Sequence, residues 1–156
     1  MNVIADAETT NDIKAARELF REYEFAMDLD LCFQGFEEEL ADLPGKYAAP
    51  DGRLLLAYCD GRLAGCAALR KLGDGVCEMK RLYVRDEFRG RGVGLSLIQR
   101  VIADARSIGY AKLRLDTAPD KMGKAVEIYR SHGFAEIPPY YHNPNDGVLY
   151  MELNLR

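Results

Sequence analysis

The chain has 156 residues, close to the usual size of one domain, and we expect a single domain over residues 1–156. Hydrophobic residues make up 48% and charged residues 29%, a balance that excludes a disordered chain. The formal net charge of −4 offers no basic footprint for nucleic acid, and no window approaches the roughly 18 apolar residues of a membrane span. No secretory signal precedes the first predicted element, so we expect a cytoplasmic protein with reduced thiols.

The four cysteines predict neither a metal site nor a disulfide framework. They form no Cys-x-x-Cys pair and no Cys/His cluster at the spacing of zinc ligands. Three of them lie in apolar, strand-like runs, where a free cysteine packs as a small hydrophobe. We therefore expect no metal. The four are Cys32, Cys59, Cys66 and Cys77.

The first third of the chain predicts a short strand and two helices. A strand near residues 3–5 precedes a helix whose apolar residues keep helical spacing from residue 13 to residue 27. A second helix, residues 33–43, ends before the breaker pair Pro44-Gly45. Its acidic run, residues 37–39, is either a solvated face or a surface on the path of a cationic substrate.

The rest of the chain predicts a hairpin followed by alternating strands and helices. Two apolar runs, residues 54–59 and 63–69, are joined through Asp60-Gly61, a pair that favours a two-residue type I′ turn. The pattern as a whole predicts an α/β (α+β) fold with a mixed sheet. The later strands and helices are predicted at residues 76–84, 95–108, 113–115, 122–132 and 148–155.

The strand predicted at residues 76–84 carries polar side chains on both faces. Strict alternation puts Arg81 on one face with Met79 and Tyr83, and Glu78 and Lys80 on the other. Three charged residues so close together are unusual in the middle of a sheet. Such a break in patterning often marks a functional site.

The run Arg89-Gly90-Arg91-Gly92-Val93-Gly94 stands between this strand and a predicted helix. Its glycines leave backbone N–H groups exposed, and the start of the helix adds a positive dipole, so the run predicts an anion site. The two arginines suit a diphosphate. The alternative is a tight turn whose arginines face water. A Walker loop would need a lysine after Gly94, and a dinucleotide fingerprint would need a glycine where Leu95 stands.

At this point the sequence resembles the GNAT family of N-acetyltransferases. The family motif Gln/Arg-x-x-Gly-x-Gly/Ala is met by Arg89, Gly92 and Gly94. Residues 78–84 are similar to the family's fourth strand, and residues 125–134 to its second motif, in which a helix carries a tyrosine shortly before Gly-Phe. The resemblance spans roughly residue 50 to the end. It implies a mixed, mostly antiparallel central sheet flanked by helices.

The resemblance also implies acetyl-CoA as the donor. Backbone N–H groups of the glycine-rich run would hold the pyrophosphate, and the pantetheine arm would pair with a strand that a bulge splays from its neighbour. Met122 stands where many members have asparagine, and Lys124 is a possible replacement for its cofactor contact. The implied cofactor-binding residues are Leu82, Tyr83, Val84, Arg89, Gly90, Arg91, Gly92, Val93, Gly94, Lys124 and Tyr129.

Acetyl transfer to an amine needs a base, because a lysine-like amine with a pKa of about 10.4 arrives protonated. Glu78 is the candidate base; its alternative is an ion pair with Lys80 or Arg81, or exposure to solvent. Tyr129 is the candidate acid toward the CoA sulfur; its alternative is a core tyrosine. A backbone N–H near residues 82–83 would stabilise the oxyanion.

The predicted function is therefore acetyl transfer from acetyl-CoA to a primary amine by direct attack in a ternary complex. The acceptor is unidentified and could be a small molecule, a peptide or a protein. The competing hypothesis is a non-catalytic acyl-CoA sensor or interaction module with the same fold. The acceptor site is expected near residues 25–36 and 138–145, and a homodimer through the final strands is implied by resemblance alone.

Overall fold

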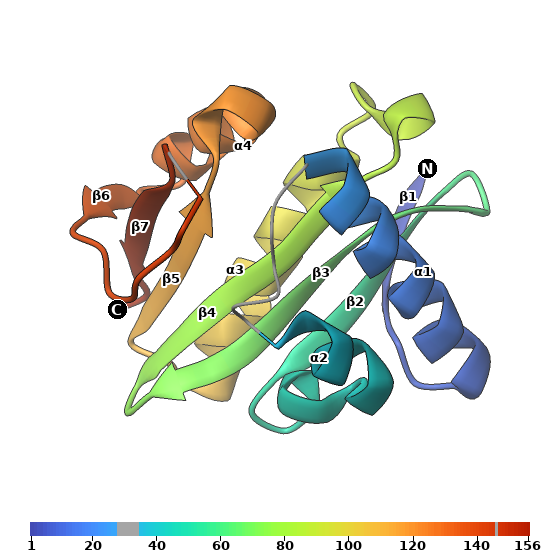
Figure 1. The fold of residues 1–156 in the computed structure, drawn as a ribbon, viewed down its shortest axis with the longest axis horizontal. Coiled ribbons are helices and arrows are strands. Elements are labelled where there is room, and N and C mark those ends of the chain that lie inside the picture. Colours follow the sequence, from blue (N-terminus) through green and yellow to red (C-terminus); the bar gives the residue numbers. More distant parts are fainter. Residues whose placement is uncertain (28–34, 146) are drawn as a thin grey trace.

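The computed structural model describes residues 1–27, 35–145 and 147–156, which form one seven-stranded sheet with helices on both faces (Figure 1). The strands are β1 (Asn2–Asp6), β2 (Arg53–Cys59), β3 (Arg62–Gly73), β4 (Val76–Val84), β5 (Lys112–Thr117), β6 (Ala135–Ile137) and β7 (Leu149–Asn154). The α-helices of the described residues are α1 (Thr10–Met27), α2 (Phe36–Asp42), α3 (Val93–Ile108) and α4 (Pro119–Ser131).

The sheet is mixed and mostly antiparallel, which confirms the predicted fold class. Its strand order is β1-β2-β3-β4-β5-β7-β6, and β4 with β5 is the parallel pair. The strand β6 was not predicted, because its three residues, Ala-Glu-Ile, are too few for alternation to indicate a strand. The helix predicted at residues 33–43 begins at Phe36 in the described part of the chain; residues 33 and 34 lie outside it.

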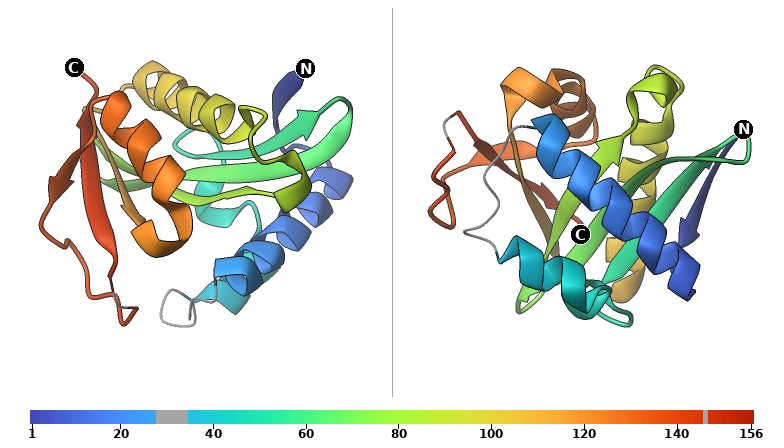
Figure 2. Two further views of the ribbon diagram at one scale, coloured as in Figure 1. Left: turned by 90° about the horizontal axis from the view of Figure 1, so that it is seen from above. Right: turned by 45° about the vertical axis from the view of Figure 1, so that its right-hand side comes forward.

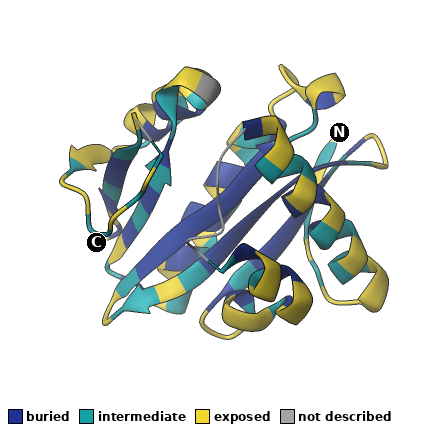
Figure 3. Ribbon diagram, in the orientation of Figure 1, coloured by how far each residue is buried: buried dark blue, intermediate teal, exposed yellow. Residues whose placement is uncertain are grey.

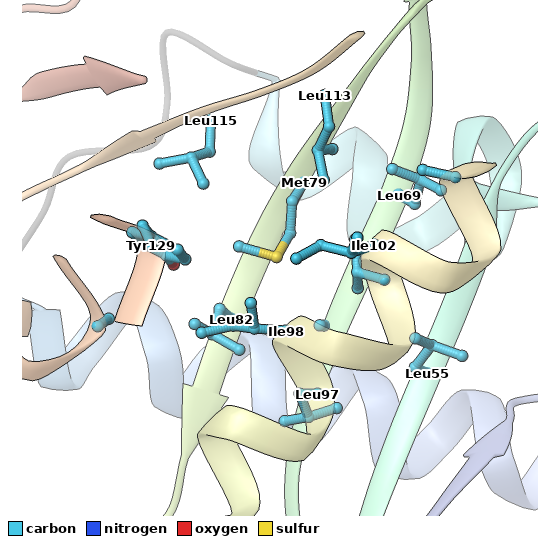
Figure 4. Packing of buried hydrophobic residues seen from close by; sticks show 14 of the residues in the cluster. Leu55, Leu69, Met79, Leu82, Leu97, Ile98, Ile102, Leu113, Leu115 and Tyr129 are labelled. Carbon is cyan, nitrogen blue, oxygen red and sulfur yellow. The ribbon is translucent and has the colours of Figure 1, made fainter. Parts of the chain in front are cut away.

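Two hydrophobic clusters, one on each face, hold the helices to the sheet. On one face α3 packs Leu97, Ile98 and Val101 against β-strand side chains such as Met79 and Leu82 (Figure 4). On the other face α1 and α2 bury their own apolar residues against β2, β3 and β4. The helices α1 and α3 therefore lie on opposite sides of the sheet (Figure 2), and the central strands are buried on both faces (Figure 3).

A β-bulge in β4 changes which face its side chains occupy. Cys66 of β3 pairs with Tyr83, whereas Ala68 pairs with Lys80, so β4 carries one extra residue between these pairs. Arg81 adopts a left-handed conformation there, with φ of 61°. Leu82 thus follows Met79 into the α3 cluster, and Tyr83 joins the α1 cluster. The strict alternation expected from the sequence is wrong beyond Lys80, and the bulge that the family resemblance implied is confirmed.

The bulge lies where β4 and β5 part. Their parallel pairing covers three positions, from Val76–Lys112 to Glu78–Arg114, and the described residues make no further pair between these strands. Figure 1 shows β4 and β5 diverging above this point. The edge of β4 after Glu78 is therefore open on the side that faces β5.

The cysteines of the described residues pack inside the fold. Cys59, Cys66 and Cys77 are buried free thiols, and burial raises the pKa of Cys77 to about 12. Such a thiol stays protonated near neutral pH and behaves as an apolar side chain. Cys32 lies outside the described residues. No helix in the described ranges has the length and apolar character needed to cross a membrane.

Candidate active site

A groove of about 470 Å³ runs along the open edge of β4, between the start of α3 and the start of α4. Nine of the residues predicted to bind a cofactor line it, together with Met27, Met122 and apolar residues of α3 and α4. The two predicted residues outside this lining are Arg91 and Tyr129. The nine are Leu82, Tyr83, Val84, Arg89, Gly90, Gly92, Val93, Gly94 and Lys124.

The first turn of α3 forms one end of the groove. Gly92 precedes the helix with φ of 79°, a conformation that side chains rarely adopt, and no side chain caps the first N–H groups. A Cβ on Gly90 would meet nothing within 4 Å, so the backbone there is open to a ligand. Uncapped N–H groups and the helix dipole together make this end an anion site.

Basic side chains border the same end of the groove. Arg89 and Lys124 both line it and are exposed to solvent. The Arg89 guanidinium is tethered at 3.0 Å to Asp86 and at 3.2 Å to the Val84 carbonyl. Arg91 points elsewhere, with its guanidinium over the Phe88 ring at 5.9 Å. The run therefore brings one of its two arginines to the groove, and Lys124 supplies a second cation.

A smaller cavity of about 40 Å³ lies beyond the groove, and Met27, Leu82 and Met122 line both spaces. Tyr129 is on its wall. The polar side chains around it come from α1, β4, β5, α4 and the loop after β6: Tyr23, Lys80, Arg81, Asp116, Thr117, Tyr129, Asn143 and Asn145.

Tyr129 belongs to both the core and this cavity. Its side chain is 2% exposed, and its ring lies 5.4 Å from that of Phe134. Figure 4 shows Tyr129 on the α4 side of the cluster, near Leu82 of β4. Burial raises the pKa of Tyr129 well above its ordinary value, so the hydroxyl keeps its proton at neutral pH.

Glu78 lies outside the linings of both the groove and the cavity. It is 1% exposed, and its carboxylate accepts hydrogen bonds from Arg70 at 2.9 Å and from the Tyr140 hydroxyl at 2.6 Å. Lys80 lies 3.8 Å away. Burial alone would raise the pKa of Glu78, but the charges of Lys80 and Arg70 and the Tyr140 hydrogen bond outweigh burial and lower it. The ion pair with Lys80 that the sequence suggested is present, whereas Arg81 pairs with Glu39 instead.

Two polar residues at the end of β5 were not predicted from the sequence as residues of the site. Asp116 accepts hydrogen bonds at Oδ2 from the Tyr141 hydroxyl and from the Asn143 amide. Thr117 is 6% exposed, and its Oγ1 has no hydrogen-bond partner among the described residues. Both residues line the cavity. Neither residue belongs to a motif. Their position at the end of a strand, shortly before the second family motif, was the one feature of the sequence that could have indicated them.

Of the acidic run on α2, Glu39 is used inside the fold, whereas Glu37 and Glu38 are exposed. Glu39 is paired with Arg81 and Lys46, and Glu37 with Arg21. This pairing removes much of the charge that suggested a cationic substrate. Residues 28–34, within the segment expected to bind the acceptor, lie outside the described residues. Within the described ranges no group of three or more His, Cys, Asp or Glu side chains could hold a metal ion.

Met122, at the position of the family asparagine, sits at a kink in α4. Its φ of −136° and ψ of 42° are not helical. The kink exposes Gly123 and Lys124 along the groove, while Met122 itself lines both spaces. The departure from the family pattern therefore falls at the junction where the groove meets the cavity.

Comparison with known proteins agrees with this geometry. A model described as the acetyltransferase (GNAT) family matches residues 13–134. An N-acetyltransferase of Schizosaccharomyces pombe is 40% identical over 97% of this chain and 94% of its own length. A GNAT-family acetyltransferase structure from Staphylococcus aureus has a TM-score of 0.80 at 20% identity, covering all of both chains. The PaiA N-acetyltransferase of Thermoplasma acidophilum, solved in complex with coenzyme A, has a TM-score of 0.73 at 18% identity and 99% coverage of each chain.

Proposed function

The chain belongs to the acetyltransferase (GNAT) family, and from that premise we propose that it transfers the acetyl group of acetyl-CoA to a primary amine. The observation that carries this proposal is the groove, which joins an uncapped helix start to the open edge of β4 and meets the smaller cavity that Tyr129 lines. An anion site at one end and a buried hydroxyl at the other fit a long thioester whose anionic part and reactive part lie far apart.

The residues along the groove fit coenzyme A segment by segment. The N–H groups of residues 92–94, with Arg89 and Lys124, would hold the pyrophosphate. The edge of residues 82–84 that faces away from β3 has no β5 partner, so the main-chain groups on that edge that no other residue holds are available to the pantetheine amides. The solved Thermoplasma structure contains coenzyme A on a similar fold, which supports coenzyme A as the ligand.

Direct transfer needs no acyl-enzyme. The amine nitrogen attacks the thioester carbon, a C–N bond forms, the C–S bond breaks, and the sulfur leaves with the bonding electrons. A backbone N–H near Leu82 or Tyr83 would stabilise the oxyanion. Tyr129 would donate its proton to the departing sulfur and regain one from solvent or from the acceptor. Its raised pKa suits a group that must arrive protonated.

Two carboxylates compete for the role of base. Glu78, predicted from the sequence, would need a proton path through Lys80 or Tyr140, because it does not line the cavity. Asp116 does line it. A substitution decides between them. The carboxylate that acts as base is the one whose amide variant, Glu78→Gln or Asp116→Asn, loses the acidic limb of the pH–rate profile, where activity falls because the base becomes protonated. An unchanged Glu78→Gln profile removes Glu78 from this role.

The test of the proposed function is thiol release from acetyl-CoA in the presence of a panel of amines, with CoA affinity measured in parallel by calorimetry. We expect micromolar CoA binding and amine-dependent thiol release. CoA binding without release on any amine would favour the alternative, a non-catalytic acyl-CoA sensor or interaction module. Homodimerisation through the final strands stays a prediction, tested by the molar mass in solution.

A further inference from the structure

The small cavity contains two side chains of opposite charge that the fold pairs only loosely. The ammonium of Lys80 is 3.8 Å from Glu78, at the far limit of an ion pair, and both Glu78 oxygens are already held by closer donors. The anion, Asp116, lies on β5 and accepts hydrogen bonds from the neutral side chains of Tyr141 and Asn143. The remaining cation of the lining, Arg81, is bound through two nitrogens to Glu39.

Burial makes this loose pairing informative. The Lys80 side chain is 6% exposed, and a buried ammonium is costly unless its donors find acceptors. Thr117 adds an independent sign of a missing ligand. Its Oγ1 is buried on the cavity wall without a hydrogen-bond partner in the described ranges, and native proteins rarely leave such a group unsatisfied. Both groups line the same cavity, so a carboxylate that reached from one to the other would satisfy both.

We infer that the acceptor is a free amino acid, whose carboxylate binds Lys80 and Thr117 while its amine lies toward Asp116 and the thioester. This inference rests on the proposed acetyl transfer. With Arg81 held by Glu39, one loosely paired cation, Lys80, and one anion, Asp116, match a zwitterion, whereas a simple amine would leave Lys80 and Thr117 without a ligand. The cavity of about 40 Å³ has room for the charged head of the acceptor, so its side chain extends outward past Asn143 and Asn145.

The test uses matched trios of acceptors with several side chains. Each trio contains the L-amino acid, its carboxamide, and the amine that lacks the carboxyl group, and thiol release gives kcat/KM for each. We expect the amino acid to exceed both analogues by about 100-fold or more, because buried groups built to bind a carboxylate are left unpaired by an analogue without one. Equal use of the three members, or preference for the carboxamide as a model of a peptide terminus, would overturn the inference and leave acetyl transfer intact.

Two variants test whether the preference for the amino acid over its analogues arises in the cavity. Lys80→Met and Thr117→Val should each raise KM for the amino acid more than KM for its carboxamide, and leave KM for acetyl-CoA unchanged. Thr117→Val should not lower the melting temperature, because it removes a hydroxyl that has no protein partner. The control Lys112→Met removes a half-exposed lysine that pairs with Glu152 at 3.6 Å, outside both linings.

The possible results distinguish a failure of the inferred acceptor class from a failure of the proposed acetyl transfer. A preference that survives both cavity variants, or a raised KM for acetyl-CoA in place of the amino acid, would place the carboxylate site elsewhere and overturn the inference. Absence of thiol release with every acceptor, despite CoA binding, would overturn the proposed function itself.

Discussion

Arg81 and Glu39 are joined by two hydrogen bonds of 2.9 Å each, although 42 residues separate them. Both side chains are almost fully buried, at 2% and 4% exposure. Arg81 also occupies the left-handed position of the β4 bulge. The pair therefore ties α2 to the bulge that brings Leu82 and Tyr83 to the groove.

Breaking this pair should destabilise the protein strongly. Glu39→Gln leaves the Arg81 guanidinium buried without its counter-ion, and we expect the free energy of unfolding to fall by about 3 kcal/mol in urea titration. Glu37→Gln on the same helix is the matched control. Its pair with Arg21 is largely exposed, so it should cost no more than about 0.5 kcal/mol. Equal losses in the two variants would contradict the role assigned to Glu39.

The same pair predicts a dependence of stability on pH. Burial would raise the pKa of Glu39, but the hydrogen bonds and charge of Arg81, with Lys46, outweigh it and hold the pKa below the ordinary 4.5. A carboxyl whose pKa is lowered by folding stabilises the protein above its unfolded pKa and loses that contribution as pH falls through the folded value. The urea concentration at the midpoint of unfolding should therefore decrease as the pH is lowered below about 4.5. The decrease should be smaller in the Glu39→Gln variant.

The two glycines that flank α3 offer a direct test of the anion site. Gly92 before the helix and Gly109 after it both have positive φ, of 79° and 109°. Replacing either by alanine should cost about 1 kcal/mol of stability, because alanine avoids this conformation. Gly92→Ala alone should weaken CoA binding in calorimetry, since it disturbs the N–H groups at the groove. Similar CoA affinity in both variants would remove the pyrophosphate from this position.

Removing the Tyr129 hydroxyl should slow turnover more than it weakens binding. A positioned acid contributes about 10²–10⁴-fold, so Tyr129→Phe should lower kcat by at least about 100-fold with little change in CoA affinity. Tyr110→Phe is the matched control. That tyrosine is also buried, but its hydroxyl donates to the Asp51 carbonyl at 2.6 Å, and its loss should affect stability alone. Near-normal turnover of Tyr129→Phe would make Tyr129 a core residue.

Local patterns in the sequence were enough to predict much of the fold and the groove. The Asp60-Gly61 turn lies between β2 and β3, and the helix after the glycine-rich run is α3. The run itself lines the groove except for Arg91, whose direction depends on packing against Phe88 and cannot be read from spacing. The weak three-residue strand β6 is formed by pairing with β7 rather than by its own pattern.

The contacts made by the charges of β4 depended on the tertiary structure. Glu78, Lys80 and Arg81 correctly marked an unusual strand, but their partners come from β3, the loop after β6, and α2. The bulge moves the Arg81 side chain out of strict alternation. The sequence does not indicate a bulge there, because arginine rarely adopts a positive φ. The cavity wall of Asp116 and Thr117 likewise appears only when β5 parts from β4.

Mass spectrometry of an amine acceptor, after incubation with the protein and acetyl-CoA, shows whether the acetyl group reaches the nitrogen. We predict that the acceptor gains one acetyl group on its amine, with one equivalent of free CoA released for each acetylated molecule. CoA released without an acetylated amine, or CoA bound with neither product formed, would contradict it.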